Sequence, residues 1–274
     1  MRLANRYRWF YGLVAGAPPS LRPWHFQWLA VVYLRADLRR VLGDQTGKIL
    51  DVGCGEKPYE HWMPRRDEYV GLDITAAPTV DVVVAPEERW PLAADSFDVV
   101  ICTQVLEHDA APLHTLAEMH RVLRPGGTLL VTLPFMYGEH DAPADYWRFS
   151  AHGAESLLRG RYAIVEVSRE GAIGSTLGIL FLTWLESALT RRRGGAIVLM
   201  ALLPLWLLLA SLVNVCSWLI DRIDPSNGFY GNVLVLAQKR GTSGSVDPEG
   251  QTRPEDKEEE TEHRHNERRL DARR

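Results

Sequence analysis

Two carboxylates and a glycine-rich turn have the residue types and the spacing to bind a small molecule. The segment KILDVGCGEKPY, residues 48–59, contains an apolar run that ends in Asp51 and is followed by Gly53-Cys54-Gly55. A second apolar run ends in Asp73. Glycines allow the backbone to approach a ligand closely, and the carboxyl ends of parallel strands meet at the edge of the sheet where such folds bind ligands. We therefore expect a ligand site on this turn.

Two classes of ligand are compatible with a glycine turn at a strand end. Dinucleotide-binding turns have the pattern G-x-G-x-x-G, because the third glycine lets the helix pack against the strand. Pro58 occupies this third position, which disfavours a nicotinamide dinucleotide. S-adenosylmethionine has a cationic amino acid group that suits Asp51 and a ribose diol that suits Asp73. A glycine turn with a purely structural role is the alternative, and it does not explain two carboxylates at strand ends.

The hydrophobicity pattern from residue 48 onward predicts an α/β fold. Short β-rich runs alternate with helical ones, and the β-rich runs are almost continuously apolar, which is typical of a parallel sheet covered on both faces. The expected strands are residues 48–52, 69–73, 80–84, 97–102, 128–133, 162–167 and 232–238. Apolar residues at intervals of three to four predict an amphipathic helix over residues 23–42.

Four ordered motifs connect this pattern to a known family. The segments ILDVGCG, VGLD, PLAADSFDVVICTQVLEH and EMHRVLRPGGTLLVTLPF occur in that order over roughly residues 48–135. On these segments the chain resembles the class I S-adenosylmethionine-dependent methyltransferases of the type-11-like group. The resemblance implies an enzyme with a Rossmann-like, mostly parallel seven-stranded sheet whose last strand is antiparallel. The segment GNVLVLAQK fits that last strand.

The resemblance also implies which residues contact S-adenosylmethionine. Asp51, Gly53 and Gly55 line the methionine and ribose end of the cofactor, and Cys54 belongs to the same turn. Asp73 accepts hydrogen bonds from the ribose hydroxyls. These five residues are the first part of the expected cofactor site.

Further cofactor contacts are expected after the third and fourth strands. Thr103 and Gln104 border the amino acid group and the transferable methyl group. The sequence departs from the family pattern twice: Lys57 replaces a glycine common among relatives, and Pro86 replaces an acid near the adenine amino group. The neighbouring Glu87 is the expected substitute, with a backbone contact as the alternative.

A loop after the fifth strand contains the expected catalytic groups. The segment MYGEHDAPADYWRFS, residues 136–150, matches an H-x-x-P-x-D-Y-W-R-F-[ST] block known from a bacterial subset of these methyltransferases. An oxygen acceptor needs a base to take its proton. His140 is the preferred base, Asp145 a further catalytic candidate, and His108 the second choice of base.

A structural role for the same block remains open. Asp145 and Arg148 can connect the loop to the following helix, while Trp147 and Phe149 pack. His108 can likewise serve as a cap for the helix that follows it.

A long apolar segment interrupts the methyltransferase pattern before the last strand. Residues 171–190 contain the single charge of Glu186, and residues 194–220 contain no charged side chain. Such a length can cross a bilayer core of roughly 30 Å. However, the last strand must return to the sheet, and the arginines 191–193 at the turn favour the cytoplasmic side. We expect a helical hairpin that lies in or dips into the inner leaflet, with a soluble lid or a dimer interface as the alternative.

Charge and cysteine content restrict the remaining options. Residues 1–41 contain seven arginines and one acid, whereas residues 241–274 contain ten acids and seven Lys or Arg, so the distribution gives no reason to expect nucleic acid as a partner. The three cysteines are far apart, which predicts reduced thiols and no metal site. The apolar run at the N-terminus is too short for a cleaved signal peptide. The basic, aromatic segment NRYRWFYGL suits a membrane surface.

The expected organisation has four parts: N-terminal amphipathic helices (1–44), a methyltransferase domain (45–170 and 223–240), an apolar hairpin (171–222) and a disordered charged tail (241–274). We expect an S-adenosylmethionine-dependent methyltransferase, and so a transferase, that is peripheral or monotopic at the cytoplasmic face of the membrane and O-methylates an amphiphilic or lipid-linked acceptor. The alternatives are a soluble O-methyltransferase of small molecules or sugars with an apolar lid, and a membrane scaffold that binds S-adenosylmethionine without turnover.

Overall fold

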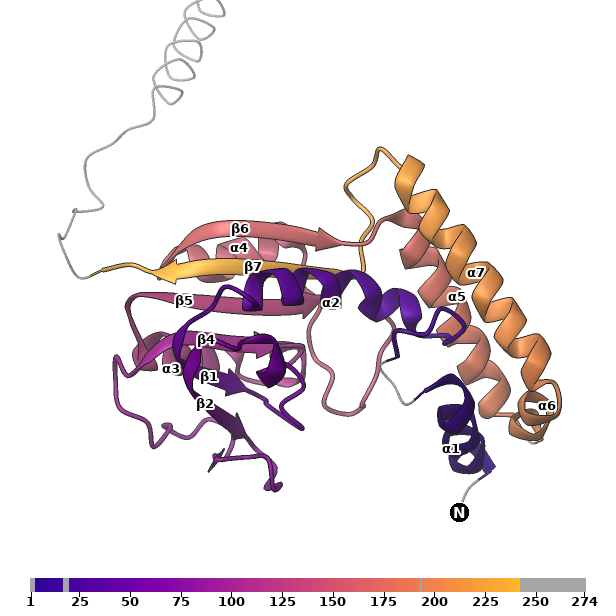
Figure 1. Ribbon diagram of the computed structural model, residues 1–274, viewed down its shortest axis with the longest axis horizontal. Helices are drawn as coiled ribbons and strands as arrows, with labels where there is room; N and C mark the ends of the chain where they lie inside the picture. Colours follow the sequence, from indigo (N-terminus) through magenta and orange to yellow (C-terminus); the bar gives the residue numbers. More distant parts are fainter. Residues whose placement is uncertain (1–2, 17–19, 193, 242–274) are drawn as a thin grey trace, which may run out of the picture. The chain divides into compact units, whose positions relative to one another are not determined.

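A seven-stranded sheet with the order β3-β2-β1-β4-β5-β7-β6 forms the centre of the computed structural model (Figure 1). The structure describes residues 3–16, 20–192 and 194–241, and the predicted disordered tail lies outside these residues except for Gly241. The strands are β1 (Gly47–Val52), β2 (Arg66–Asp73), β3 (Val82–Val83), β4 (Phe97–Thr103), β5 (Leu123–Pro134), β6 (Tyr162–Glu170) and β7 (Asn232–Lys239).

The direction of the strands confirms the expected fold class. Strands β1 to β5 pair in parallel, whereas β7 is antiparallel to both of its neighbours, β5 and β6. The carboxyl ends of β1, β2 and β4 therefore lie at one edge. Asp51 pairs with Gly71 on one side and with Ile101 on the other, which places the three strand ends next to each other.

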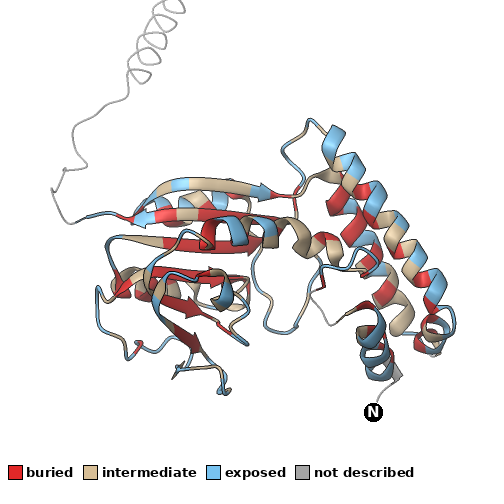
Figure 2. Cartoon of the chain, in the orientation of Figure 1, coloured by how far each residue is buried: buried red, intermediate tan, exposed pale blue. Residues whose placement is uncertain are grey.

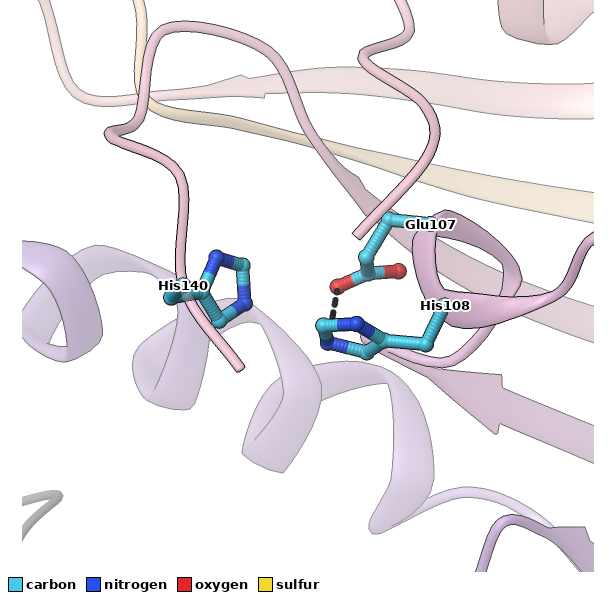
Figure 3. Close-up of side chains that lie close together, drawn as sticks. All are labelled: Glu107, His108 and His140. Atoms are coloured by element: carbon cyan, nitrogen blue, oxygen red, sulfur yellow. Dashed lines mark ion pairs between the residues drawn. The ribbon is translucent and has the colours of Figure 1, made fainter. Parts of the chain in front are cut away.

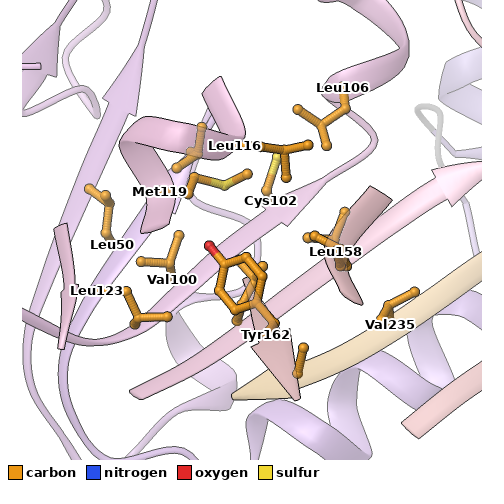
Figure 4. Packing of buried hydrophobic residues seen from close by; sticks show 14 of the residues in the cluster. Leu50, Val100, Cys102, Leu106, Leu116, Met119, Leu123, Leu158, Tyr162 and Val235 are labelled. Atoms are coloured by element: carbon orange, nitrogen blue, oxygen red, sulfur yellow. The ribbon is translucent and has the colours of Figure 1, made fainter. Parts of the chain in front are cut away.

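Helices cover both faces of the sheet. On one face, α2 (Trp28–Leu42) contributes Leu34, Leu38 and Leu42 to a buried cluster with strand residues such as Ile49. On the other face, α3 (Pro112–Val122) and α4 (Ala151–Arg159) pack over the larger cluster shown in Figure 4. Burial on both faces explains the continuous apolar runs in the strand sequences.

The segment between β6 and β7 forms a helical hairpin. Helix α5 (Ile173–Thr190) and helix α7 (Leu203–Ile223) pack along each other, and the short α6 (Gly195–Ala201) lies between them at the turn (Figure 1). Helix α1 (Leu3–Ala15) packs beside α6. These helices share a buried cluster that includes Tyr7, Leu182, Leu199 and Trp206. Their outer sides stay exposed (Figure 2).

Two predicted helices differ from those in the structure. The helix expected over residues 23–42 begins at Trp28, because the chain before it makes successive turns, with His25 donating its amide to Arg22. The apolar run 194–220 is two helices that meet at Leu202, since Pro204 has no amide hydrogen and fits only the first turn of α7. The domain boundaries remain a prediction.

Candidate active site

The glycine turn after β1 has a backbone conformation that glycine adopts without strain. Gly53 and Gly55 have φ angles of +69° and +46°. A Cβ atom on Gly53 would lie 2.3 Å from a methyl carbon of Val105, whereas a Cβ on Gly55 would meet nothing within 4 Å. The turn is therefore packed against Val105 on one side and open at Gly55.

Asp51 lies buried directly below this turn. Its Oδ2 accepts a hydrogen bond of 2.6 Å from the hydroxyl of Tyr69, on the neighbouring strand β2. Burial raises the pKa of Asp51 to about 7, although the Tyr69 hydroxyl and the charge of Lys57 act in the opposite direction. Because a nearby cation favours the ionised form, an ammonium group bound here would stabilise the Asp51 carboxylate.

Asp73 at the end of β2 orders the loop that faces it. Its Oδ2 accepts a hydrogen bond of 3.1 Å from the amide of Gly55, and its Oδ1 accepts one of 3.0 Å from the amide of Thr75. Asp73 is only half-buried, so its carboxylate remains accessible to a ligand. The turn and this carboxylate are thus already held in contact.

The remaining predicted cofactor residues lie around the same sheet edge. Thr103 is the buried last residue of β4, and the amide nitrogen of Gln104 donates to Thr132 on β5 over 3.0 Å. Cys54 is buried beneath the turn, and Glu87 is exposed beyond β3. The structure thus places Cys54 under the turn and Glu87 on the surface, and the role of each in cofactor binding stays a prediction.

Lys57 occupies the position at which many relatives have a glycine. Its φ angle of +52° lies in the region that favours glycine, which gives a physical reason for glycine at this position in relatives. Its ammonium group forms an ion pair of 2.5 Å with Asp81. The turn therefore carries a lysine side chain that is paired with Asp81, where a glycine would have no side chain.

Three side chains meet beside this sheet edge (Figure 3). Glu107 and His108 belong to the short helix η2 (Leu106–His108) that follows β4, and His140 lies on the loop after β5. The rings of His108 and His140 are edge to face with centroids 4.8 Å apart. Glu107 is completely buried, and its Oε1 lies 3.9 Å from Nε2 of His108.

Asp145 is held in an ion pair rather than free as a base. The Arg148 guanidinium donates to both of its carboxylate oxygens, at 2.6 and 2.7 Å, and the amide of His140 donates to it at 2.8 Å. These hydrogen bonds keep the pKa of Asp145 well below its usual range. The printed contacts of Arg148 stay within the loop, at Asp145 and at the carbonyl oxygens of Tyr137 and Gly138, whereas the structural alternative expected them to reach the following helix. The catalytic role of Asp145 stays a prediction.

A cavity of about 760 Å³ adjoins His140 and extends between the loop and the helical hairpin. The loop contributes Tyr137 and His140, α1 contributes Tyr7 and Arg8, and α5 contributes Trp184 and Glu186. Aromatic rings and charged groups therefore share its lining. This mixture suits an acceptor that has both an apolar and a polar part.

Three of these features were not predicted from the sequence. Glu107 lies next to the predicted His108, but nothing in the segment LEH signals a buried carboxylate that lacks a hydrogen-bond partner among the described residues. The bond from Tyr69 to Asp51 depends on the pairing of β1 with β2. Glu186 lines the cavity. It is the only charged residue of residues 171–190, and a single charge in an apolar segment is the sequence feature that could have indicated this position.

Comparisons with known proteins give relatives for the central part of the chain. A family model described as "Methyltransferase domain" matches residues 50–131. This match and the topology define that part of the chain as a class I S-adenosylmethionine-dependent methyltransferase domain. It ends before the predicted catalytic loop and the hairpin.

The curated relatives share part of their length with this chain. The "Ubiquinone biosynthesis O-methyltransferase" of Hahella chejuensis is 36% identical over 97 residues, which are 30% of this chain and 41% of the relative. The protein of the same name from Pseudomonas syringae pv. tomato is 31% identical over 147 residues, 47% of this chain and 61% of the relative. The chain thus spans about half the length of the curated relatives it matches.

Among solved structures, the 1,6-didemethyltoxoflavin-N1-methyltransferase of Burkholderia thailandensis, which contains S-adenosylhomocysteine, is 16% identical with a TM-score of 0.47. The match covers 77% of this chain and 78% of that one.

The described residues fit S-adenosylmethionine. The backbone is open at Gly55, and the carboxylates of Asp51 and Asp73 lie on either side of the turn. Asp51 suits the ammonium group of the methionine part, and Asp73 suits the ribose hydroxyls. The cofactor's reactive end would then lie toward Gln104 and the cluster of Glu107, His108 and His140.

Proposed function

We propose that this protein is an S-adenosylmethionine-dependent methyltransferase that acts on a hydroxyl group of an amphiphilic acceptor at a membrane surface. One observation carries the proposal: the glycine turn with its two carboxylates lies at the same sheet edge as the pair of His108 and His140, and His140 lines a large cavity. The cofactor supplies an activated methyl group on a sulfonium sulfur. The protein mainly has to position the acceptor in line with that methyl group.

The histidine pair provides the group that accepts the hydroxyl proton. His140 lines the cavity and is the proposed base, with His108 as the second candidate. Nδ1 of His140 lies 3.3 Å from Oδ2 of Asp145, and this contact orients the ring so that Nε2 is available. The curated relatives named O-methyltransferases support an oxygen acceptor.

The exposed side chains of the helical hairpin support a membrane surface as the place of action. Helices α5 and α7 are both long and apolar enough to cross a membrane by length and composition. Large apolar side chains are exposed on the outer sides of α1, α5 and α7: Trp9, Phe10, Leu13, Leu177, Phe181, Trp184, Leu205, Leu208, Leu212, Val215, Leu219 and Ile223. Apolar patches of this extent mark interaction surfaces or membrane contacts.

The cavity connects this surface to the chemistry. Trp184 on α5 contributes both to the exposed apolar side and to the cavity lining, so the cavity and the apolar surface share a wall. Arg8 and Arg191 also line the cavity and suit an anionic headgroup or a phosphate-linked acceptor. We infer that an acceptor with its apolar tail in the bilayer can reach His140 from this side. The position of Trp184 is also compatible with the alternative, a soluble enzyme in which the hairpin forms an apolar lid over the cavity.

The test is methyl transfer from radiolabelled S-adenosylmethionine, by the purified full-length protein, into separate lipid and water-soluble extracts of the source organism. The double variant Asp51→Ala, Asp73→Ala is the blank. Label in the lipid extract supports the proposal and provides the product for identification. Label in the aqueous extract alone favours the soluble enzyme with a lid. Bound cofactor without label in either extract favours a non-catalytic scaffold.

A further inference from the structure

We propose that Glu107, His108 and His140 bind one divalent transition-metal ion, such as zinc, beside the site of methyl transfer. The metal site itself does not depend on the proposed function, and only the role given to the ion rests on it. Among the described residues, the buried carboxylate of Glu107 has no hydrogen-bond partner.

Glu107 is buried without compensation. Its exposed fraction is 0%, and neither of its carboxylate oxygens has a hydrogen-bond partner in another described residue. A buried carboxylate is costly unless it is paired with a cation, hydrogen-bonded or protonated. Glu107 forms an ion pair with His108, but Nε2 of His108 is 3.9 Å from the carboxylate, which is too far for a hydrogen bond. A positive charge bound beside Glu107 would therefore stabilise its ionised carboxylate.

The hydrogen bonds of both histidines leave a lone pair free for a metal. Nδ1 of His108 lies 2.5 Å from the carbonyl oxygen of Ala144, and because a carbonyl oxygen accepts, this nitrogen carries the hydrogen. Nδ1 of His140 lies 3.3 Å from both the Gly138 carbonyl oxygen and Oδ2 of Asp145, which are also acceptors. In the neutral rings, each Nε2 is then an unprotonated ligand atom. Metal-binding histidines are typically oriented in this way by an oxygen on the other nitrogen.

The geometry brings three ligand atoms close to each other. One ligand atom from each of the three residues lies within 4.8 Å of the others. Ligands of a tetrahedral zinc ion, at about 2.0–2.2 Å from the metal, are about 3.4 Å apart. Metal binding therefore requires the three ligand atoms to move toward one another by up to about 1.4 Å. Two imidazoles and a carboxylate form a three-ligand set typical of catalytic metal sites with an open position.

The open position gives the ion a role in the proposed reaction. His140 also lines the cavity, so an acceptor hydroxyl in the cavity can occupy the fourth position. A Lewis acid lowers the pKa of a bound hydroxyl, whose proton then leaves to solvent. The oxygen forms its bond to the methyl carbon, and the carbon–sulfur bond breaks with its electron pair on sulfur. The histidines then act as ligands, and the ion replaces the base.

The test is metal binding by the purified full-length protein after chelator treatment, with neither S-adenosylmethionine nor acceptor present. Zinc affinity is measured by competition with a chromophoric chelator, and cobalt(II) is used as a spectroscopic probe of the ligand geometry. Glu107→Gln and His140→Gln are the site variants. His152→Gln is the matched control, because His152 is exposed on α4 away from this cluster. His140 lies on a loop, so its variant tests the site even if Glu107→Gln fails to fold.

We expect one zinc per chain, a tetrahedral cobalt absorption band, and affinities at least about tenfold weaker in both site variants but unchanged in the control. Absence of stoichiometric binding, or equal affinity in the wild type and His140→Gln, would overturn the proposal and would indicate that a proton neutralises Glu107. Calorimetric binding of S-adenosylmethionine to the same preparations is independent of these outcomes. A failure of the metal site can therefore be distinguished from a failure of the methyltransferase proposal.

Discussion

Arg148 holds Asp145 through two hydrogen bonds of 2.6 and 2.7 Å inside the loop that carries His140. The same guanidinium donates to the backbone carbonyl oxygens of Tyr137 and Gly138. One side chain thus connects both ends of the loop that lines the cavity next to His140.

Arg148→Lys is expected to loosen this loop without weakening cofactor binding. A lysine ammonium cannot reproduce the planar, two-pronged contact and the two carbonyl contacts at once. We expect faster hydrogen exchange of the amides of residues 137–147 and an affinity for S-adenosylmethionine within about twofold of wild type. Arg159→Lys, in an exposed pair with Glu155 on α4, is the control. Unchanged exchange in Arg148→Lys would show that the loop is ordered by other contacts.

Asp73→Asn is expected to weaken the binding of S-adenosylmethionine by roughly 10- to 100-fold, because hydrogen bonds to a charged acceptor contribute about 1.5–3 kcal/mol. Isothermal titration calorimetry measures the affinity. Asp67→Asn, exposed near the opposite end of the same strand β2, is the control and should leave the affinity unchanged. Equal affinities for Asp73→Asn and wild type would place the ribose elsewhere.

Glu170→Gln is expected to stabilise the protein increasingly as the pH rises from about 4.5 to 8. Burial, followed by the charge of Asp37, raises the pKa of Glu170 from 4.5 to about 8. Below 4.5 the group is protonated in both the folded and the unfolded chain. Above 4.5 the unfolded chain ionises first, so the wild type loses stability until pH 8, above which the loss is complete.

The measurement for Glu170→Gln is the Tm as a function of pH. At pH 8 we expect the Tm to rise by roughly 2–4 °C for each kcal/mol gained in the free energy of unfolding, with little change in Tm at pH 4. Glu88→Gln, exposed on the loop after β3, is the control. A difference in Tm that does not vary with pH would contradict the burial effect.

Leu208→Asp is expected to reduce binding to anionic lipid vesicles several-fold. Leu208 is 65% exposed on the outer side of α7, so the substitution adds a charge to the apolar surface without a change in the packed core. Leu113 is 63% exposed on α3 over the sheet, and Leu113→Asp is the matched control. Cosedimentation with vesicles measures the binding. Equal pelleting of both variants and the wild type would assign the hairpin a role away from the membrane.

The part of the fold built from local patterns was predictable from the sequence. All seven strands overlap their predicted ranges, and β1, β4 and the second half of β5 were the clearest because buried parallel strands are marked by continuous apolar runs. Asp51 and Asp73 were found because they end such runs. The break at Leu202 was missed, since the apolar composition on both sides concealed the effect of Pro204.

Contacts between distant segments were not predictable in the same way. Glu107 and His140 are separated along the chain by β5, and their approach depends on the path of the loop after that strand. The sequence located His140 on the loop after β5, but its neighbours Glu107 and His108 were visible only in three dimensions. Asp145 was predicted as a catalytic candidate, whereas its carboxylate is occupied by Arg148.

The two ends of the hairpin segment meet at a single point of the sheet. Glu170 pairs with Asn232, and the amide of Gly231 donates to the carbonyl oxygen of Glu170 over 3.0 Å. Everything between them is therefore, in topological terms, an enlarged turn between two adjacent antiparallel strands. Because β6 and β7 are hydrogen-bonded up to this point, we expect a short connection in place of residues 172–230 to preserve their register. The hairpin is thus an insertion at one joint of the sheet.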